Sequence, residues 1–247
     1  MEQKKFYSEV TGYYDEIFPL NPLQVEFVRD EFRSLDELYF LDAGCSTGKL
    51  AHELSQLGAL GVGIDLNEEM IGEARKRYSS AFLTFKTMDM IRIDRFFPAT
   101  YFDAVICFGN TLVHLDSLAE VKAFLSQAAA VLKPGGKLLL QILNYDYILD
   151  SQITELPLIR TEKLEFRRYY VLPGPGQTKL SFKTVLTDYS CGREIVNEIP
   201  LLPLRKKELE KLLLFSGFKT VRFYGGFRKE PFTGEHLPLI TVAENDD

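Results

Sequence analysis

Short apolar runs alternate with amphipathic helical segments along the first 145 residues, and this alternation is the strongest constraint on the fold. The apolar runs, which predict strands, lie at 38–43, 61–65, 82–87, 102–108 and 137–143. Between most of these runs, apolar side chains recur with the spacing of a helix that buries one face. Strands that alternate with helices pair in parallel and carry helices on both faces of the sheet. The sequence therefore predicts an α/β fold with a doubly wound, mostly parallel sheet.

The pattern changes after residue 150. Strand-like runs then follow one another without helices, at 163–171, 179–186 and 193–199. The earlier pattern resumes with a helix at 205–216 and strands at 218–224 and 237–243, which brings the main sheet to seven strands. We expect residues 1–150 and 203–247 to form the core domain. Residues 151–202 are expected to form a small antiparallel meander inserted after the fifth strand, covering the substrate site.

Charge and composition exclude some classes of binding partner. The chain of 247 residues carries 29 basic and 35 acidic side chains, a formal net charge of −6 that provides no positive field for nucleic acid. It opens without the apolar segment of a secretory signal, and no apolar run approaches the ~18 residues that span a bilayer. Three cysteines without metal-binding spacing read as reduced thiols. We expect a cytoplasmic protein that binds neither nucleic acid nor membrane.

A glycine-containing turn follows the first predicted strand, in the segment Asp42-Ala43-Gly44-Cys45-Ser46-Thr47-Gly48. Gly44 and Gly48 allow the backbone to pass close to a ligand, and the next helix offers free N–H groups at its start. The dinucleotide fingerprint requires three glycines, but its second and third places hold Ser46 and Lys49. Asp42 would suit a cation or an amino group better than a pyrophosphate. The alternative is a turn that binds nothing.

Two further acids follow the next two predicted strands. Asp65 ends the second strand, where a carboxylate can accept hydrogen bonds from the hydroxyls of a ribose. Asp89 follows the third strand between Met88 and Met90, whose thioethers could line an adenine ring. Each acid alone could be an ordinary turn residue. Three such segments in order, each after a successive strand, indicate a nucleoside site more specifically than any one of them.

Together these segments resemble the class I S-adenosylmethionine-dependent methyltransferases, over residues 38–143. Two more segments share in the resemblance, Phe102-Asp103-Ala104-Val105 and Lys133-Pro134-Gly135-Gly136. The resemblance implies S-adenosylmethionine as cofactor, with Gly44 and Gly48 facing its methionine portion, Asp65 its ribose, and Asp89 and Met90 its adenine. Ser46 stands where many members have glycine. The residues expected to bind the cofactor are Asp42, Gly44, Ser46, Gly48, Asp65, Leu66, Met70, Asp89, Met90 and Phe108.

Later segments are similar to the glycine/sarcosine N-methyltransferase branch of that class. They are Gly109-Asn110-Thr111-Leu112-Val113-His114-Leu115, Asn144-Tyr145-Asp146, and Gly226-Phe227-Arg228-Lys229-Glu230-Pro231. In that branch an arginine precedes the Asn-Tyr-Asp segment and holds the amino-acid carboxylate. Here the position is Leu143, which cannot form a bidentate pair with a carboxylate. The resemblance therefore implies an N-methyltransferase without identifying glycine as its substrate.

Three side chains are candidates for the chemistry. Asn110 could offer a carbonyl to an amine, or could satisfy its own loop. His114 could accept a proton or hold the cofactor's carboxylate, or could make a local hydrogen bond. Tyr14, beside Tyr13, could form an aromatic lid around a cationic methyl group, or could pack in an amphipathic helix.

The candidates for substrate binding are Tyr145, Arg168 and Tyr170. Arg168 could replace the missing carboxylate anchor, although strand alternation alone does not decide which neighbour points inward. Alternatively, these side chains could lie on a solvent-exposed face of the sheet and bind no substrate. The histidines are too isolated in sequence to suggest a metal site, and none is expected.

The sequence thus favours a methyltransferase that acts on a small molecule, at an amine nitrogen, by in-line displacement. A nicotinamide-dependent oxidoreductase is disfavoured by the missing glycine and by the lack of a Tyr-x-x-x-Lys segment on a helix. The alternative of a non-catalytic regulatory protein that binds S-adenosylmethionine or folate remains, because the same motifs serve binding and catalysis. Methylation of RNA or protein is weakened by the acidic charge balance. The acceptor and the oligomeric state are not readable.

Overall fold

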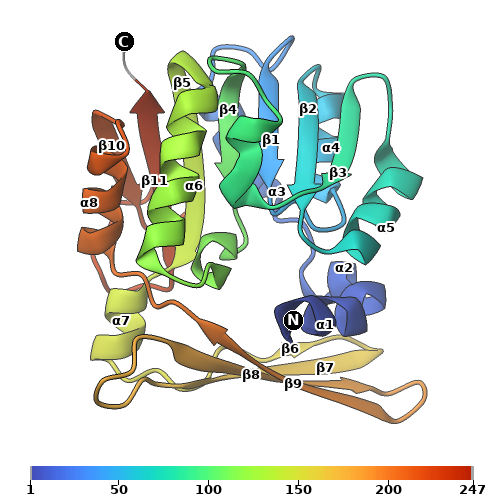
Figure 1. Ribbon diagram of the computed structural model, residues 1–247. Coiled ribbons are helices and arrows are strands. Elements are labelled where there is room, and N and C mark those ends of the chain that lie inside the picture. The colour runs from blue at the N-terminus through green and yellow to red at the C-terminus, as the bar shows by residue number, and fades with distance from the viewer. Residues whose placement is uncertain (1, 246–247) are drawn as a thin grey trace.

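The computed structural model describes residues 2–245 and contains two β-sheets (Figure 1). The strands of the larger sheet, in spatial order, are β10 (Thr220–Tyr224), β11 (Pro238–Asn245), β5 (Leu132–Leu143), β4 (Phe102–Cys107), β1 (Tyr39–Ala43), β2 (Leu60–Asp65) and β3 (Leu83–Thr87). β11 pairs antiparallel with both its neighbours, and the other pairs are parallel. The predicted seven-stranded, mostly parallel sheet is confirmed.

Helices cover both faces of this sheet, with α6 and α8 in front and α3 and α4 behind in Figure 1. The helical segments are α1 (Glu2–Val10), η1 (Thr11–Tyr13), α2 (Tyr14–Ile17), α3 (Pro22–Glu31), α4 (Lys49–Gln56), α5 (Glu68–Tyr78), η2 (Met90–Arg95), η3 (Thr111–His114), α6 (Leu118–Val131), α7 (Tyr145–Asp150) and α8 (Lys206–Phe215). Three of the longer helices begin at capping side chains that accept a backbone N–H, namely Asn21, Asn67 and Ser117. The Asn67 cap fixes where α5 starts, and hence where the site residues before it lie.

The second sheet is antiparallel and consists of β6 (Ile159–Arg160), β7 (Leu164–Val171), β8 (Leu180–Asp188) and β9 (Arg193–Leu201). It has one strand more than the three-stranded meander that the sequence predicts. The extra strand, β6, pairs only Ile159 and Arg160 with β7, and so short a strand leaves no alternation to detect. Figure 1 shows this sheet lying across the carboxyl ends of the parallel strands.

The N-terminal helices α1 and α2 lie between the two sheets (Figure 1). Phe6 in α1 packs edge-on against Phe182, and Phe18 after α2 packs edge-on against Phe166, at ring-centroid distances of 6.4 and 5.7 Å. The Tyr13 hydroxyl donates a 2.7 Å hydrogen bond to Asp188. These contacts enclose the space beneath the parallel strands. Among residues 2–245, no helix has the length and apolar character needed to cross a bilayer.

Candidate functional site

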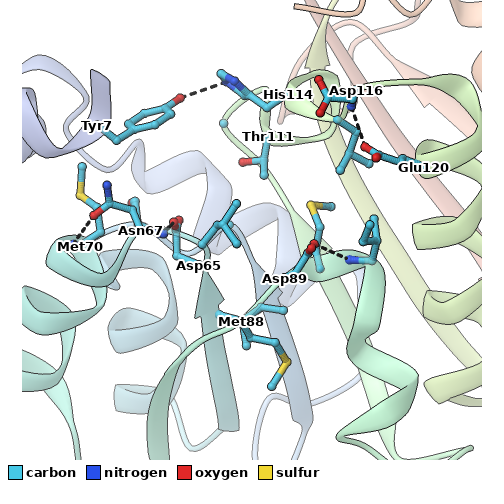
Figure 2. A pocket seen from close by; sticks show the side chains of 18 of the residues that line it. Tyr7, Asp65, Asn67, Met70, Met88, Asp89, Thr111, His114, Asp116 and Glu120 are labelled. Carbon is cyan, nitrogen blue, oxygen red and sulfur yellow. Dashed lines mark hydrogen bonds between the residues drawn. The ribbon is translucent and has the colours of Figure 1, made fainter. Parts of the chain in front are cut away.

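A cavity of about 210 Å³ lies at the carboxyl ends of β1, β2, β3 and β4 (Figure 2). A larger cavity of about 610 Å³ adjoins it on the side of α3 and the loop after β10. The residues that line both cavities are Tyr14, Gly44, Ser46, Gly109 and Thr111. In an α/β sheet this edge is where ligands bind, because the loops that follow the parallel strands converge there.

Bare backbone forms the wall between the two cavities. Gly44 has φ of +82°, and a Cβ there would lie 2.4 Å from Cγ2 of Thr111. Gly109 has φ of +74°, and a Cβ there would meet no atom within 4 Å, so this backbone faces open space. Gly48 differs from the expectation that it contacts the ligand. It lines neither cavity, and a Cβ there would lie 2.6 Å from the Phe85 ring, so its role is to let α4 start close to β3.

Asp65 lies at the end of β2 in the wall of the smaller cavity (Figure 2). Its Oδ2 accepts a 3.0 Å hydrogen bond from the Ser46 backbone N–H, and its Oδ1 accepts a 2.8 Å bond from that of Asn67. Burial raises the pKa of the carboxyl, and these backbone N–H groups oppose the rise. The carboxylate is therefore held in one orientation and keeps lone pairs for a ligand's hydroxyl groups.

Asp42 is 3% exposed and lines the larger cavity. Burial, with the charge of nearby Asp65, raises the pKa of Asp42 to about 7. Two acids this close in a low-dielectric site favour a cationic ligand, whose charge would allow both to ionise.

An apolar slot lies beyond Asp65. The side chains that form it are Ile64, Leu66, Met70, Met88, Met90 and Ile91. Asp89 stands at its edge, where Oδ1 accepts a 3.1 Å hydrogen bond from the Ile91 backbone N–H (Figure 2). Apolar walls with a carboxylate acceptor at the edge suit a heterocyclic base that carries an amino group.

Tyr7 and His114 face one another across the mouth of the smaller cavity (Figure 2). The Tyr7 hydroxyl and His114 Nε2 are 3.0 Å apart. Burial lowers the pKa of His114 to about 4, so the imidazole is neutral at physiological pH. Its Nδ1 is buried and has no hydrogen-bond partner among the described residues.

The sequence analysis missed Tyr7 and named its neighbours Tyr13 and Tyr14. Tyr14 does line both cavities, and burial raises the pKa of its hydroxyl to about 12. Tyr7 and Tyr14 are two helical turns apart, and their rings lie 6.2 Å apart. That seven-residue spacing is the signal in the sequence that could have indicated Tyr7. Tyr13 instead bonds to the second sheet.

Asn110 lies behind the cavities, with φ of 66°. Its Oδ1 accepts a 2.9 Å hydrogen bond from the Leu143 backbone N–H, and its Nδ2 donates a 3.0 Å bond to the Tyr145 hydroxyl. Tyr145 is fully buried, and its ring lies 6.4 Å from that of Tyr170 on β7. The structure therefore places Asn110, Tyr145 and Tyr170 in a link from β4 and β5 to the second sheet, instead of in a cavity wall.

The other expected residues divide between the cavities and the second sheet. Leu66, Met70, Asp89 and Met90 line the smaller cavity, and Phe108 lines the larger one. Arg168 lines neither, and its Nη2 donates a 2.7 Å hydrogen bond to the Pro157 carbonyl. Within residues 2–245, no three His, Cys, Asp or Glu side chains are grouped so that they could hold a metal ion.

Comparison with known proteins relates this chain to methyltransferases. Residues 40–136 match the family described as "Methyltransferase domain". The glycine/sarcosine N-methyltransferase of Aphanothece halophytica is 28% identical over 210 residues, covering 83% of this chain and 76% of that protein. The ubiquinone biosynthesis O-methyltransferase of Rhodopseudomonas palustris (strain TIE-1) is 28% identical over 148 residues, covering 56% of each chain. This chain therefore spans about half the length of that second relative.

Two solved structures share the fold over most of their length. An S-adenosylmethionine-dependent methyltransferase from Clostridium acetobutylicum ATCC 824 aligns with a TM-score of 0.80 at 15% identity, covering 98% of this chain and 99% of that one. CalS10 from Micromonospora echinaspora, described as an amino pentose methyltransferase with S-adenosylmethionine bound, aligns with a TM-score of 0.68 at 22% identity, covering 90% and 88%. The first of these likenesses covers nearly the whole chain and therefore includes the second sheet.

Proposed function

We propose that this chain, which is a class I S-adenosylmethionine-dependent methyltransferase, methylates the nitrogen of a small amine. The observation that carries the proposal is the Tyr7–His114 pair at the mouth of the smaller cavity, where a neutral imidazole keeps an unpartnered nitrogen. A relative named for N-methylation and a structural neighbour named for an amino sugar support the same reading. We propose the division into a core of residues 1–150 and 203–247 and a cover of residues 151–202.

The two cavities fit S-adenosylmethionine. We assign the apolar slot and Asp89 to adenine, and Asp65 to the ribose hydroxyls. The backbone of Gly109 faces open space and leaves room for the methionine portion, beside Gly44 in the lining of both cavities, and Asp42 in the adjoining cavity matches its ammonium group. The cofactor supplies a methyl group on a positively charged sulfur, ready for displacement by a lone pair.

The protein's own residues then have two tasks. An amine attacks only in its neutral form, so the ammonium loses its proton to solvent before it is seated. His114 is itself neutral and lines the smaller cavity beside the Tyr7 hydroxyl, so the pair can hold the neutral amine by hydrogen bonding. The second sheet and α1 exclude water from the mouth, which keeps the lone pair unsolvated and aimed.

The experiment that tests the proposal is transfer of a labelled methyl group across matched panels of small amines and phenols. We expect transfer to at least one amine, with the label recovered on nitrogen. Transfer to phenols alone would contradict N-methylation and favour the O-methyl activity named for the ubiquinone biosynthesis relative.

Replacement of His114 by glutamine should lower kcat for the amine about tenfold, because the imidazole that positions the neutral amine is lost. Tyr7→Phe, which keeps the ring and removes only the hydroxyl, should lower kcat by a smaller factor. Steady-state kinetics at saturating cofactor measure both. Unchanged kcat in both variants would show that the pair takes no part in the reaction.

Cofactor affinity should rise with pH between about 5 and 7. The free carboxyl of Asp42 has a pKa raised to about 7, whereas the cofactor's ammonium favours the ionised form, so binding below pH 7 must expel a proton. The loss of affinity on acidification approaches about tenfold per pH unit well below that pKa. Titration calorimetry in buffers of different ionisation enthalpy measures the released proton. Asp42→Asn should make the pH dependence shallower, leaving only the part that comes from Asp65, and the same slope in that variant would contradict the assignment.

A further inference from the structure

Three polar side chains form a straight row across the inward face of the second sheet. The strand register pairs Arg168 on β7 with Thr184 on β8, and Thr184 with Asn197 on β9. On this face the residues next to the row are apolar or aromatic, namely Phe166, Tyr170, Phe182, Leu186, Ile195 and Ile199, and the charged pair Asp188 and Arg193 lies at one end of the face. A polar row through the middle of an apolar face is not what packing alone would select.

The polar atoms of this row are buried and unpaired. Arg168 Nε, Thr184 Oγ1 and Asn197 Nδ2 are out of reach of solvent and have no hydrogen-bond partner within the described part of the chain. Thr184 as a whole is only 1% exposed. Proteins leave few such atoms, because each loses its hydration without compensation. The His114 Nδ1 atom is a further member of the same small set.

The chemistry of the row is that of an anion receptor. The Arg168 guanidinium and the Asn197 amide nitrogen are donors, and the Thr184 hydroxyl can also donate. Arg168 is the sole charge among the three, and the Pro157 carbonyl holds its Nη2. Oxygen anions such as carboxylate and phosphate are the groups that such donors bind most strongly.

The row borders the same interior as the Tyr7–His114 pair. Phe182 lies on this face beside Thr184 and packs against Phe6, whose ring centroid lies 4.7 Å from that of Tyr7. We infer that Arg168, Thr184 and Asn197 bind an anionic oxygen group of the methyl acceptor, so that the substrate carries a carboxylate or phosphate besides its amine. The inference rests on the proposed function for the amine.

Access to the row requires the N-terminal helix to move. α1 packs against β9, and Phe6 lies edge-on to Phe182 beside the row. An acceptor can reach the three donors only when α1 lifts away.

Binding to protein loaded with S-adenosylhomocysteine tests the inference without requiring turnover. The probes are β-alanine, O-phosphoethanolamine and ethanolamine, which offer a carboxylate, a phosphate and a neutral hydroxyl beside similar amines. We expect one anionic probe to bind at least about tenfold more tightly than ethanolamine. The anionic probe that binds more tightly identifies the acceptor's acid group as carboxylate or phosphate. If neither anionic probe binds, or if both bind only as tightly as ethanolamine, the inference is overturned.

Matched variants locate the preference. Arg168→Met should abolish it, whereas Arg167→Met, which removes the same charge from the opposite face of β7, should preserve it. If the Arg168→Met variant still binds the anionic probe more tightly than ethanolamine, the assignment of the row as the anion site is overturned. Anion binding through the row without methyl transfer to any amine would contradict the proposed function and leave the row intact, so the two failures are distinguishable.

Stability distinguishes a binding row from a structural one. Valine has nearly the shape of threonine, and removing an unpaired buried hydroxyl relieves its lost hydration. Thr184→Val should therefore leave the denaturation midpoint unchanged or raise it while weakening binding of the preferred anion. Thr187→Val, on the outer face of β8, serves as the control. A lowered midpoint in Thr184→Val alone would show that the hydroxyl serves the fold and would overturn the inference.

Discussion

Replacing Asp65 by alanine is expected to weaken S-adenosylmethionine binding about 100-fold, or roughly 3 kcal/mol. The carboxylate is fixed by the Ser46 and Asn67 backbone N–H groups at 3.0 and 2.8 Å, so it is already aimed when the ligand arrives. Hydrogen bonds from ribose hydroxyls to an ionised, partly buried acceptor are stronger than neutral ones. Alanine removes those bonds and also leaves the two N–H groups unpaired. Titration calorimetry measures the change directly.

Two further variants distinguish the loss of hydrogen bonds from a general effect of charge. Asp65→Asn keeps one acceptor oxygen and the side-chain volume, so it should fall between wild type and alanine. Glu68→Gln removes a nearby charge from the exposed first turn of α5 and should leave affinity unchanged. Wild-type affinity in Asp65→Ala would contradict the ribose assignment. A loss of equal size in Glu68→Gln would show a general charge effect instead of a hydrogen bond.

The parts of this site that the sequence predicts are those set by local structure. Asp65 and Asp89 each follow a strand, and strand ends can be read from short apolar runs. Asn67 and Ser117 cap helices through bonds to residues three positions later, so their neighbours in sequence are also their neighbours in space. These local signals place the loops after β1, β2 and β3 along one edge of the sheet.

The parts that the sequence does not predict depend on partners far along the chain. Tyr7 bonds to His114, 107 residues away, and no periodicity in either segment indicates that pairing. Gly48 satisfies a glycine motif, but its spatial neighbour is Phe85, which only the folded sheet brings there. Alternation in β7 leaves two choices for Arg168, and pairing with Thr184 decides between them. Tertiary contacts of this kind determine the acceptor side of the site.

A methyl group added at Gly61 is expected to destabilise the protein by about 3 kcal/mol or more. Gly61 lies in β2, between β1 and the edge strand β3, and is opposite Phe40 in the register of β1 and β2. A Cβ there would lie 2.2 Å from the Phe40 ring, whose side chain is fully buried and has no free space to enter. The backbone of Gly61 is ordinary strand, so the expected loss comes from overpacking and not from strain. For a chain of this size the loss lowers Tm by about 6–12 °C.

Gly72→Ala is the matched control, because that glycine lies in the exposed face of α5 with no atom within 4 Å of a Cβ. The same methyl group there should stabilise the protein by about 0.5–1 kcal/mol, since alanine favours helix. Calorimetric unfolding of both variants shows whether the loss of stability comes from the lack of space around Gly61 or from the glycine-to-alanine change itself. If overpacking against Phe40 is the cause, Phe40→Leu in the Gly61→Ala background should recover about 1–3 kcal/mol relative to the sum of the single variants. Strict additivity would mean that the lost stability arises elsewhere in β2, and the close approach of the first two strands would then not be what requires glycine there.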